Sequence, residues 1–444
     1  MALTGMQIYK SLPKTNCKDC GLPTCMAFAM QVAAKQRALE DCPHVSDEAT
    51  SSLAESSAPP MKLVKIGSEE RKVEIGQETV MFRHEDKLHR STGVAVRFDA
   101  SLTDDEVDAK LKMVSADVFV RVGERIFVKF CAVEVDGVDD PAGRMKKIVD
   151  TSCLAPIVMG SDAAKVKAAA EAVKGERPLI YRAEAANADA MIALAKDLGL
   201  PLAIHAPSLE ELADLSQKAK DAGVEDLVLS FDCDNLGDTI RTLTTSRRTA
   251  LKKQFRPLGY PSMATVNTGS PELDTVFAAS CAAKYCGIVI VDGAEPHQVL
   301  PILTIVQDVY TDPQVPNTVE TKLYEIGDPG ENSPVLFTTN FSLTYFSVEG
   351  EVERSKVPTY ICVVDTEGLG VLNAYAGDKI SAEKVVKTLK EQGVADKVKH
   401  RQLIIPGLLP IFRAEIEDTS EWTEVIIGPE NAREIPAFLS SNWG

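Results

Sequence analysis

The chain has 444 residues with 48 Lys and Arg against 65 Asp and Glu, so its net charge is -17 and its pI is near 5.0. A chain this acidic is repelled by nucleic acid and by anionic membranes, and we exclude both as partners. At roughly 150 residues per domain, the length predicts about three domains.

The N-terminal stretch lacks the apolar core of a secretory signal, and no segment reaches the roughly 20 apolar residues that cross a bilayer. We therefore expect a cytoplasmic protein. Because the cytosol keeps thiols reduced, its ten cysteines are expected to be thiols or metal ligands rather than disulfides.

Four of these cysteines lie within the first 42 residues, in a C-x2-C-x4-C-x16-C spacing: Cys17, Cys20, Cys25 and Cys42. The helix-like run 26–39 follows the third cysteine, and Pro43 follows the fourth. Structural zinc sites more often use two C-x2-C pairs, whereas three close cysteines plus a remote Cys-Pro favour a [4Fe-4S] cluster. Zinc remains the alternative. His44 is expected to face solvent.

A small polar segment, residues 46–60, ends in two prolines and reads as a linker. Residues 61–92 predict a hairpin from the runs MKLVKIG and ETVMFR, which we expect to cover the bottom of the next domain. Eight apolar strands then alternate with amphipathic helices such as 208–223, where Ser208 and Glu211 form a capping box. This count predicts a TIM (β/α)8 barrel. The strands are expected at 94–98, 126–135, 155–159, 178–182, 201–205, 226–231, 262–266 and 287–291.

Catalytic residues of barrel enzymes lie at the carboxyl ends of the strands. The polar residues expected there are Asp99, Glu134, Glu184, His205, Asp232, Asp234, Asn267 and Asp292. No acid and base stand at a spacing that indicates catalysis, so we interpret them as loop caps and contacts and name no catalytic residue. Phosphate-loop and dinucleotide-binding motifs are absent from the sequence.

After a Pro-containing break at 312–317, strands are expected at 333–340, 358–365, 400–407 and 422–430, with a helix over 381–393. Four strands do not close a barrel, so an open doubly wound sheet is the better prediction. The loops after these strands offer hydroxyls, amides and glycine backbone for a large ligand, although ordinary loop chemistry accounts for them equally well. The polar candidates are Thr338, Thr339, Asn340 and Thr344, and the apolar ones are Phe341, Phe346, Leu372, Leu408 and Leu409.

The opening TGMQIYKSLPKTNCKDCGLPTCMAFAM, with Cys42-Pro43 and this domain order, resembles the large (gamma) subunits of the corrinoid iron-sulfur proteins of acetyl-CoA decarbonylase/synthase complexes. The resemblance spans the whole chain. It implies an α/β protein with a small [4Fe-4S] domain (1–57), a central TIM barrel (61–311) and a C-terminal open doubly wound corrinoid-binding domain (318–444).

The resemblance also implies site residues. The four N-terminal cysteines would ligate the [4Fe-4S] cluster. The positions for a cobalamin-type corrinoid are Asn340, Phe346, Gly370, Val371, Leu372, Asn373 and, at a turn, Pro436. None of the six histidines lies in the Asp-x-His-x-x-Gly run that places a ligand below cobalt in many corrinoid proteins, which eases reduction of Co(II).

The implied function is methyl carriage in the reductive acetyl-CoA pathway. Cobalt would accept methyl from methyltetrahydrofolate through a separate methyltransferase and donate it to acetyl-CoA synthase/CO dehydrogenase, with the cluster reactivating Co(II). A smaller barrel subunit would complete a heterodimer, and the Pro-containing breaks at 56–60 and 312–317 would act as hinges. Two alternatives remain: a barrel enzyme that itself binds methyl-pterin, and a plain iron-sulfur electron carrier.

Overall fold

The computed structural model describes residues 5–33, 37, 41–46, 59–116 and 118–443. The chain divides into two compact units. One contains the cysteine segment, a hairpin and a barrel, and the other contains residues 82–88, 112–128 and 295–444. The predicted linker at 46–60 and the end of the helix predicted over 26–39 lie largely outside the described residues. Within the described ranges no helix is both long and apolar enough to span a bilayer.

The hairpin that precedes the barrel consists of β1 (Leu63–Ile66) and β2 (Val73–Gly76), which pair antiparallel. Val64, Ile66 and Ile75 are buried in one cluster with residues of the barrel interior. The amide of Gly67 donates to the carbonyl of Arg177, just before a barrel strand, so the hairpin covers the amino ends of the strands as expected. The prediction was wrong about its second strand, because the run 78–83 belongs to no strand and β1 pairs instead with the earlier residues 73–76.

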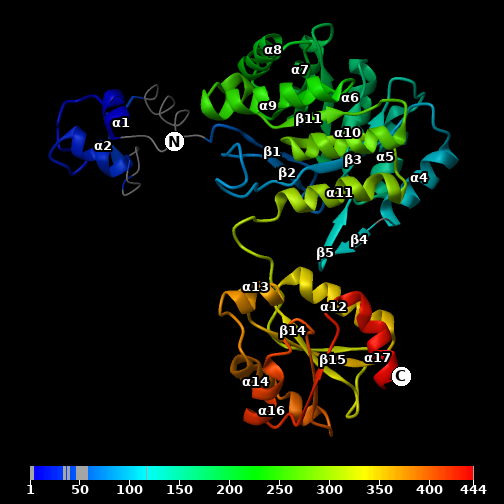
Figure 1. The fold of residues 1–444 in the computed structure, drawn as a ribbon. Coiled ribbons are helices and arrows are strands. Elements are labelled where there is room, and N and C mark those ends of the chain that lie inside the picture. The colour runs from blue at the N-terminus through cyan, green and yellow to red at the C-terminus, as the bar shows by residue number, and fades with distance from the viewer. Residues whose placement is uncertain (1–4, 34–36, 38–40, 47–58, 117, 444) are drawn as a thin grey trace. The chain divides into compact units, whose positions relative to one another are not determined.

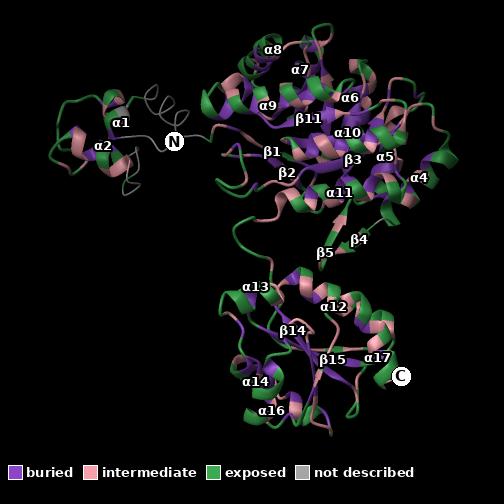
Figure 2. Cartoon of the chain, viewed as in Figure 1, coloured by how far each residue is buried: buried purple, intermediate pink, exposed green. Residues whose placement is uncertain are grey.

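Eight parallel strands close the predicted barrel, in the order β10-β11-β12-β3-β6-β7-β8-β9. Figures 1 and 2 show the strands as a buried centre with helices outside. Every residue of β7 and of β12 is buried, because one side of each strand meets the barrel interior and the other meets helices. The strands are β3 (Gly93–Phe98), β6 (Phe130–Glu134), β7 (Ala155–Met159), β8 (Leu179–Ala183), β9 (Leu202–Ile204), β10 (Leu227–Asp232), β11 (Ser262–Thr265) and β12 (Cys286–Val291).

The run predicted as one strand over 126–135 is two elements. Its first residues belong to β5 (Glu124–Phe127), which pairs antiparallel with β4 (Val118–Arg121), and the barrel strand starts only at Phe130. Val122 and Gly123, at the turn between β4 and β5, both have positive φ, of 52° and 72°. Two such residues define the tight turn that fits the twist of a hairpin, so the excursion is a local structure hidden inside an apolar run.

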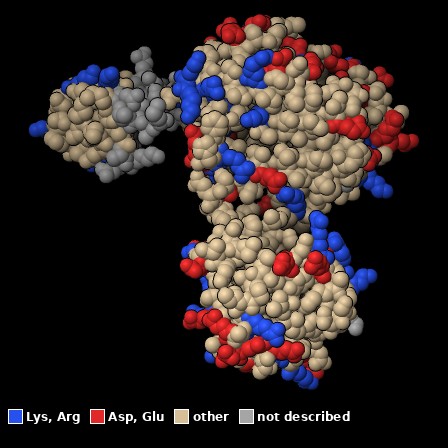
Figure 3. Space-filling view, in the orientation of Figure 1, with Lys and Arg blue, Asp and Glu red and all other residues tan. Residues whose placement is uncertain are grey.

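A helix follows each barrel strand in the sequence. Ser208 caps α8 as predicted, because its hydroxyl accepts from the Glu211 amide, whereas the Glu211 carboxylate accepts from the Ser208 hydroxyl instead of completing a capping box. On the face drawn in Figure 3, the barrel surface carries both acidic and basic side chains. The helices are α4 (Asp104–Ala116), α5 (Pro141–Thr151), α6 (Ala163–Ala172), α7 (Ala188–Leu198), α8 (Leu209–Asp221), α9 (Leu236–Lys252), α10 (Pro271–Ala283) and α11 (Pro296–Tyr310).

The C-terminal sheet has five strands in the order β13-β15-β14-β16-β17. The four predicted strands are present and mutually parallel, whereas β13 (Leu323–Ile326) was missed and pairs antiparallel with β15 at one edge. Its four residues include none that is fully buried, so its apolar signal is weak. The predicted strands are β14 (Val335–Thr339), β15 (Thr359–Val364), β16 (Gln402–Ile405) and β17 (Glu424–Ile427).

Helices cover both faces of this sheet. Alternate residues of β14 point to opposite sides, with Val335 and Phe337 in one core and Leu336 in the other. The first core includes α14 and α16, and the second includes α12 and α17. The helices are α12 (Ser342–Ser355), α13 (Val371–Ala376), α14 (Ala382–Glu391), α15 (Val394–Lys397), α16 (Phe412–Thr419) and α17 (Ile435–Trp443).

Candidate functional site

The N-terminal cysteines surround a small core between two helices. Helix α1 (Gly5–Ser11) packs on α2 (Cys25–Ala33) through Ile8 and Phe28, and the buried side chains of Cys25 and Cys42 belong to the same cluster. Cys20 packs against it while half exposed. Three of the four predicted ligands therefore share one core, although they are separated by up to 22 positions in sequence.

The fourth predicted ligand, Cys17, is exposed on the same segment. Its sulfur lies within 4.8 Å of ligand atoms of Asp19 and His44, and His44 follows Cys42 by two residues. His44 is exposed, as predicted, and its Nε2 lies 2.6 Å from Asp19 Oδ2. Hydrogen bonds from His44 and Cys17 lower the pKa of Asp19. All four thiols are free of disulfides, so the donor set fits a thiolate-bound centre.

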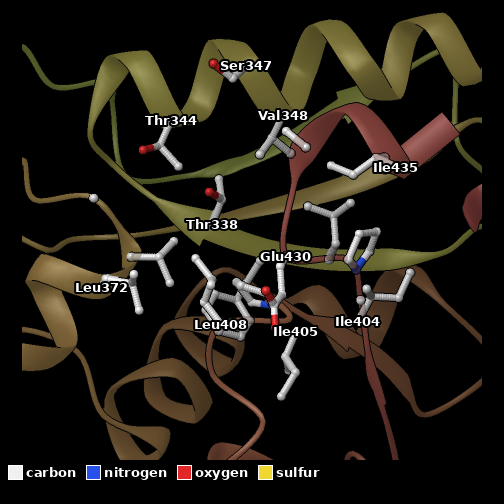
Figure 4. A pocket seen from close by; sticks show the side chains of 18 of the residues that line it. Thr338, Thr344, Ser347, Val348, Leu372, Ile404, Ile405, Leu408, Glu430 and Ile435 are labelled. Carbon is white, nitrogen blue, oxygen red and sulfur yellow. The ribbon is translucent and has the colours of Figure 1, made fainter.

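The second candidate site is a cavity of about 490 Å³ in the C-terminal domain. It lies where β14 and β16 diverge, since these strands pair only at Leu336 and Ile404. In the sheet, β15 lies on one side of β14 and β16 on the other, so the strand order reverses direction at β14. Open α/β sheets bind ligands at such a topological switch point. Figure 4 shows its mainly apolar wall, which includes Val348, Ile404, Leu408 and Ile435.

One polar group in this wall has no partner. Thr338, on β14, is 1% exposed, and its Oγ1 forms no hydrogen bond. Figure 4 places its hydroxyl beside the cavity, below the α12 residues Thr344 and Val348. Leaving a buried hydroxyl unpaired costs about 1–3 kcal/mol, which a ligand with a suitable polar atom would recover. The cavity thus fits a ligand that is largely apolar with a few polar atoms.

The predicted corrinoid positions separate into two groups. Gly370, Val371, Leu372 and Asn373 line the cavity at the start of α13. Asn340 does not line it: the residue is 5% exposed, and its side-chain oxygen accepts from the Thr366 and Gly368 amides.

Asn340 therefore holds the loop that precedes α13 rather than facing the cavity. Phe346 packs edge-on against Tyr345 in the α12 core and is not among the cavity residues. Pro436 lies inside α17, where a turn was expected, and does not line the cavity either. Thr338 and Thr344, two of the polar candidates named from the sequence, do line the cavity. Ser347 and Glu430 also line it and were not predicted.

Two arginines organise the polar end of the barrel, and the sequence interpretation overlooked both because they lie within strands. Arg97 of β3 binds Asp292 with two hydrogen bonds, of 2.5 and 2.8 Å. It also lies 3.6 Å from Asp99 and 3.8 Å from Glu134. Three of the predicted carboxyl-end residues, Asp99, Glu134 and Asp292, thus pair with Arg97.

Arg182 of β8 binds both oxygens of Asp232 and one of Glu184. Its Nη1 also donates to the Tyr181 hydroxyl, at 2.9 Å. His205 Nε2 lies 3.6 Å from Asp232 while its Nδ1 contacts the Ser230 carbonyl. Asp234 and Asn267 are exposed. These pairings neutralise the acids at the carboxyl end, which supports the interpretation of that end as structural contacts.

We expect Asp232→Asn to lower stability by about 1 kcal/mol at neutral pH, because Arg182 loses its charged partner. Burial raises the pKa of Asp232, but the hydrogen bonds and charge of Arg182 outweigh it, so the pKa is lowered. The ion pair therefore stabilises the fold at pH values above about 3.9, the pKa of Asp in an unfolded chain. This contribution to the free energy of unfolding is lost as the pH falls. Solvent screening limits the effect, because Asp232 is 38% exposed.

Urea unfolding of both proteins between pH 3 and pH 7 measures this effect, with Asp234→Asn as the exposed control. The difference between wild type and Asp232→Asn should shrink toward acidic pH. A difference that is constant across the range would contradict the assignment of this stability to the ionised pair.

Together these features define a class: a multidomain protein in which a barrel stands in sequence between a cysteine-rich segment and an α/β domain with a cavity at its switch point. The family model of the CO dehydrogenase/acetyl-CoA synthase delta subunit matches residues 63–439, and the chain belongs to that family. A family model for an Fe-S cluster segment matches residues 12–44.

Relatives match over nearly their full length. The corrinoid/iron-sulfur protein large subunit of Moorella thermoacetica is 41% identical, covering 100% of this chain and 99% of that protein. The acetyl-CoA decarbonylase/synthase complex subunit gamma of Methanopyrus kandleri is 36% identical, covering 98% and 97%. The resemblance inferred from the sequence is thereby confirmed. Dihydropteroate synthase from Xanthomonas albilineans aligns with a TM-score of 0.38 and 15% identity over 58% of this chain and 100% of that one, which carries no argument about function.

Proposed function

We propose that this chain is the methyl-carrying subunit of an acetyl-CoA synthase system. In this proposal residues 1–57 hold a [4Fe-4S] cluster, residues 61–311 form a scaffold barrel, and residues 318–444 bind a corrinoid. The name of the Moorella thermoacetica relative, a corrinoid/iron-sulfur protein that matches the whole chain, supports both cofactors, and the Fe-S family match over residues 12–44 supports the cluster. When bound, the corrinoid supplies a cobalt centre that accepts and passes on a methyl group, and the cluster supplies single electrons.

The observation that carries the corrinoid assignment is the cavity at the switch point with its unpaired Thr338 hydroxyl. A cavity of about 490 Å³ lies within the range of small-ligand sites and suits a part of a corrinoid, whereas the macrocycle needs open surface beside it. Leu343 and Leu372, which line the cavity, are 52% and 54% exposed and offer that apolar surface.

The chain would contribute no nitrogen ligand to cobalt in this arrangement. His400 is the one histidine in the sequence after His297. Its Nε2 contacts the carbonyl of Ser333, which precedes β14, so His400 lies at the amino end of the sheet. The cavity opens at the carboxyl end, where Gly370 to Asn373 and Leu408 stand. This placement supports a cobalt held without a protein imidazole.

For the cluster, Cys17, Cys20, Cys25 and Cys42 would be the ligands, since all four lie on the same small helical segment. The partners that follow from the proposal are a smaller corrinoid iron-sulfur subunit, a methyltetrahydrofolate methyltransferase, and acetyl-CoA synthase/CO dehydrogenase. Because the methyl group must reach two of these enzymes, the corrinoid site has to be accessible to each in turn.

Metal analysis and absorbance of anaerobically purified protein test the proposal. Cobalt and iron together, with a corrin band beside a broad iron-sulfur shoulder, are expected. Iron without cobalt, in protein from cells that make corrinoids, would favour the plain electron carrier, and zinc without iron would remove the cluster assignment.

The barrel itself should not bind the methyl donor. We expect Asp232→Asn and Asn267→Ala to change the rate of methyl transfer from a separate methyltransferase by less than about twofold, because the acids at the barrel's carboxyl end are paired with Arg97 and Arg182. Stopped-flow absorbance of the corrinoid measures that rate. A large fall in rate, with folding intact, would shift the function to the barrel enzyme.

A further inference from the structure

The loop that joins α1 to α2 has an unusual backbone. Lys14, Asn16 and Lys18 have positive φ values of 60°, 52° and 69°, while the residues between them do not. Such values are uncommon outside glycine, although Asn adopts them more readily than most residues. Alternation of left-handed and other conformations turns successive backbone N–H groups toward one side, as in the concave anion sites that occur around phosphates and iron-sulfur clusters.

Asn16 makes a reciprocal contact with one predicted cluster ligand. Its backbone N–H points at the sulfur of Cys25, with 3.4 Å between nitrogen and Sγ. Its side-chain Oδ1 accepts from the backbone N–H of Cys25, at 2.8 Å. Asn16 also directly precedes Cys17, so this one residue links the position of Cys17 to that of Cys25, which lies nine positions after Asn16.

Capping of α2 alone does not account for this contact. Cys25 is the first residue of the helix, and its N–H therefore lacks an acceptor within the helix. The hydroxyl of Thr24 already caps the helix by accepting from the Ala27 amide. The Asn16 carboxamide satisfies the Cys25 amide in addition, and the left-handed backbone that this requires directs the Asn16 N–H to the sulfur.

We propose that Asn16 is a positioning residue that fixes Cys25 and raises the reduction potential of the cluster. This inference rests on the proposed [4Fe-4S] cluster. An N–H directed at a thiolate sulfur stabilises negative charge there, and the reduced cluster carries one more negative charge than the oxidised one. Removing the interaction disfavours reduction, so the midpoint potential should become more negative.

The test uses the full-length protein, purified anaerobically, with iron content and an EPR-monitored redox titration as readouts. Asn16→Gly keeps a backbone that tolerates positive φ and loses only the carboxamide. Asn16→Ala loses both features. Thr24→Ala is the control, since it removes a cap of α2 whose hydroxyl bonds to the Ala27 amide and not to Cys25.

Both Asn16 variants should show a midpoint potential more negative than wild type, with the larger shift or outright loss of iron in Asn16→Ala, while Thr24→Ala keeps iron and potential. Unchanged potentials in both Asn16 variants, or an equal change in Thr24→Ala, would overturn the proposal. Absence of iron from the wild type would instead refute the cluster assignment itself, so the two failures are distinct.

Discussion

Replacing Cys20 by Ala should abolish the iron-sulfur absorbance and leave the corrinoid bound. Cys20 is one of four thiols on the N-terminal segment. A [4Fe-4S] cluster is held by four cysteine thiolates, so losing Cys20 leaves one iron without its protein ligand. Iron per protein should fall by at least about tenfold, as measured by metal analysis and absorbance, because the segment is too small to hold the cluster by packing.

Cys153→Ala is the matched control for this variant. Cys153 is an exposed, free cysteine between α5 and β7, outside the N-terminal segment. Its replacement should leave iron and cobalt at wild-type levels. Full iron content in Cys20→Ala would show that a different set of ligands holds the metal.

Val348→Trp should prevent corrinoid binding while leaving iron in place. Val348 lines the cavity from α12, and Figure 4 shows its side chain directed toward the space below that helix. A bulky indole there occupies the volume that a ligand needs, and affinity should fall by more than about tenfold, equivalent to at least 1.4 kcal/mol. Titration of the apoprotein with a corrinoid, followed by absorbance, measures the affinity.

Glu353→Trp places the same side chain on the same helix, at an exposed position that does not line the cavity. Corrinoid binding should be unaffected in this control. Equal affinity in Val348→Trp and wild type would mean that the corrinoid lies elsewhere. Taken with Cys20→Ala, the two variants should separate the cofactors, because each removes one and spares the other.

The barrel was predictable because each of its strands is a short, almost continuous apolar run. Strands buried on both sides need no polar residues, and β7 (Ala155–Met159) matched its predicted range. The same signal misled where two apolar elements adjoin, since the two-residue gap between β5 and β6, Val128 and Lys129, differs from the strands around it by only one charged residue. The edge strand β13 failed for the opposite reason: its half-exposed residues carry little apolar pattern.

The family was likewise available from the sequence, and cysteine spacing along a short chain limits which thiols can share a centre, so the four proposed ligands could be named before the structure was known. The loops at the carboxyl ends of the strands in the last domain could also be located from the sequence, because the apolar runs show where each strand ends. Gly370 to Asn373 line the cavity, as that location suggests.

Side-chain pairings over long separations were decided by the tertiary structure. Arg182 pairs with Asp232, 50 positions away, and Asn340 holds the loop at Thr366 rather than facing the cavity. The Thr338 hydroxyl, buried on β14 beside the cavity, has no hydrogen-bond partner. Apolar periodicity and cysteine spacing are properties of neighbouring residues, so the sequence by itself determined the elements and the thiol set. Which polar atoms meet, and which remain without a partner, depends on how distant elements pack, and that is fixed only when the chain folds.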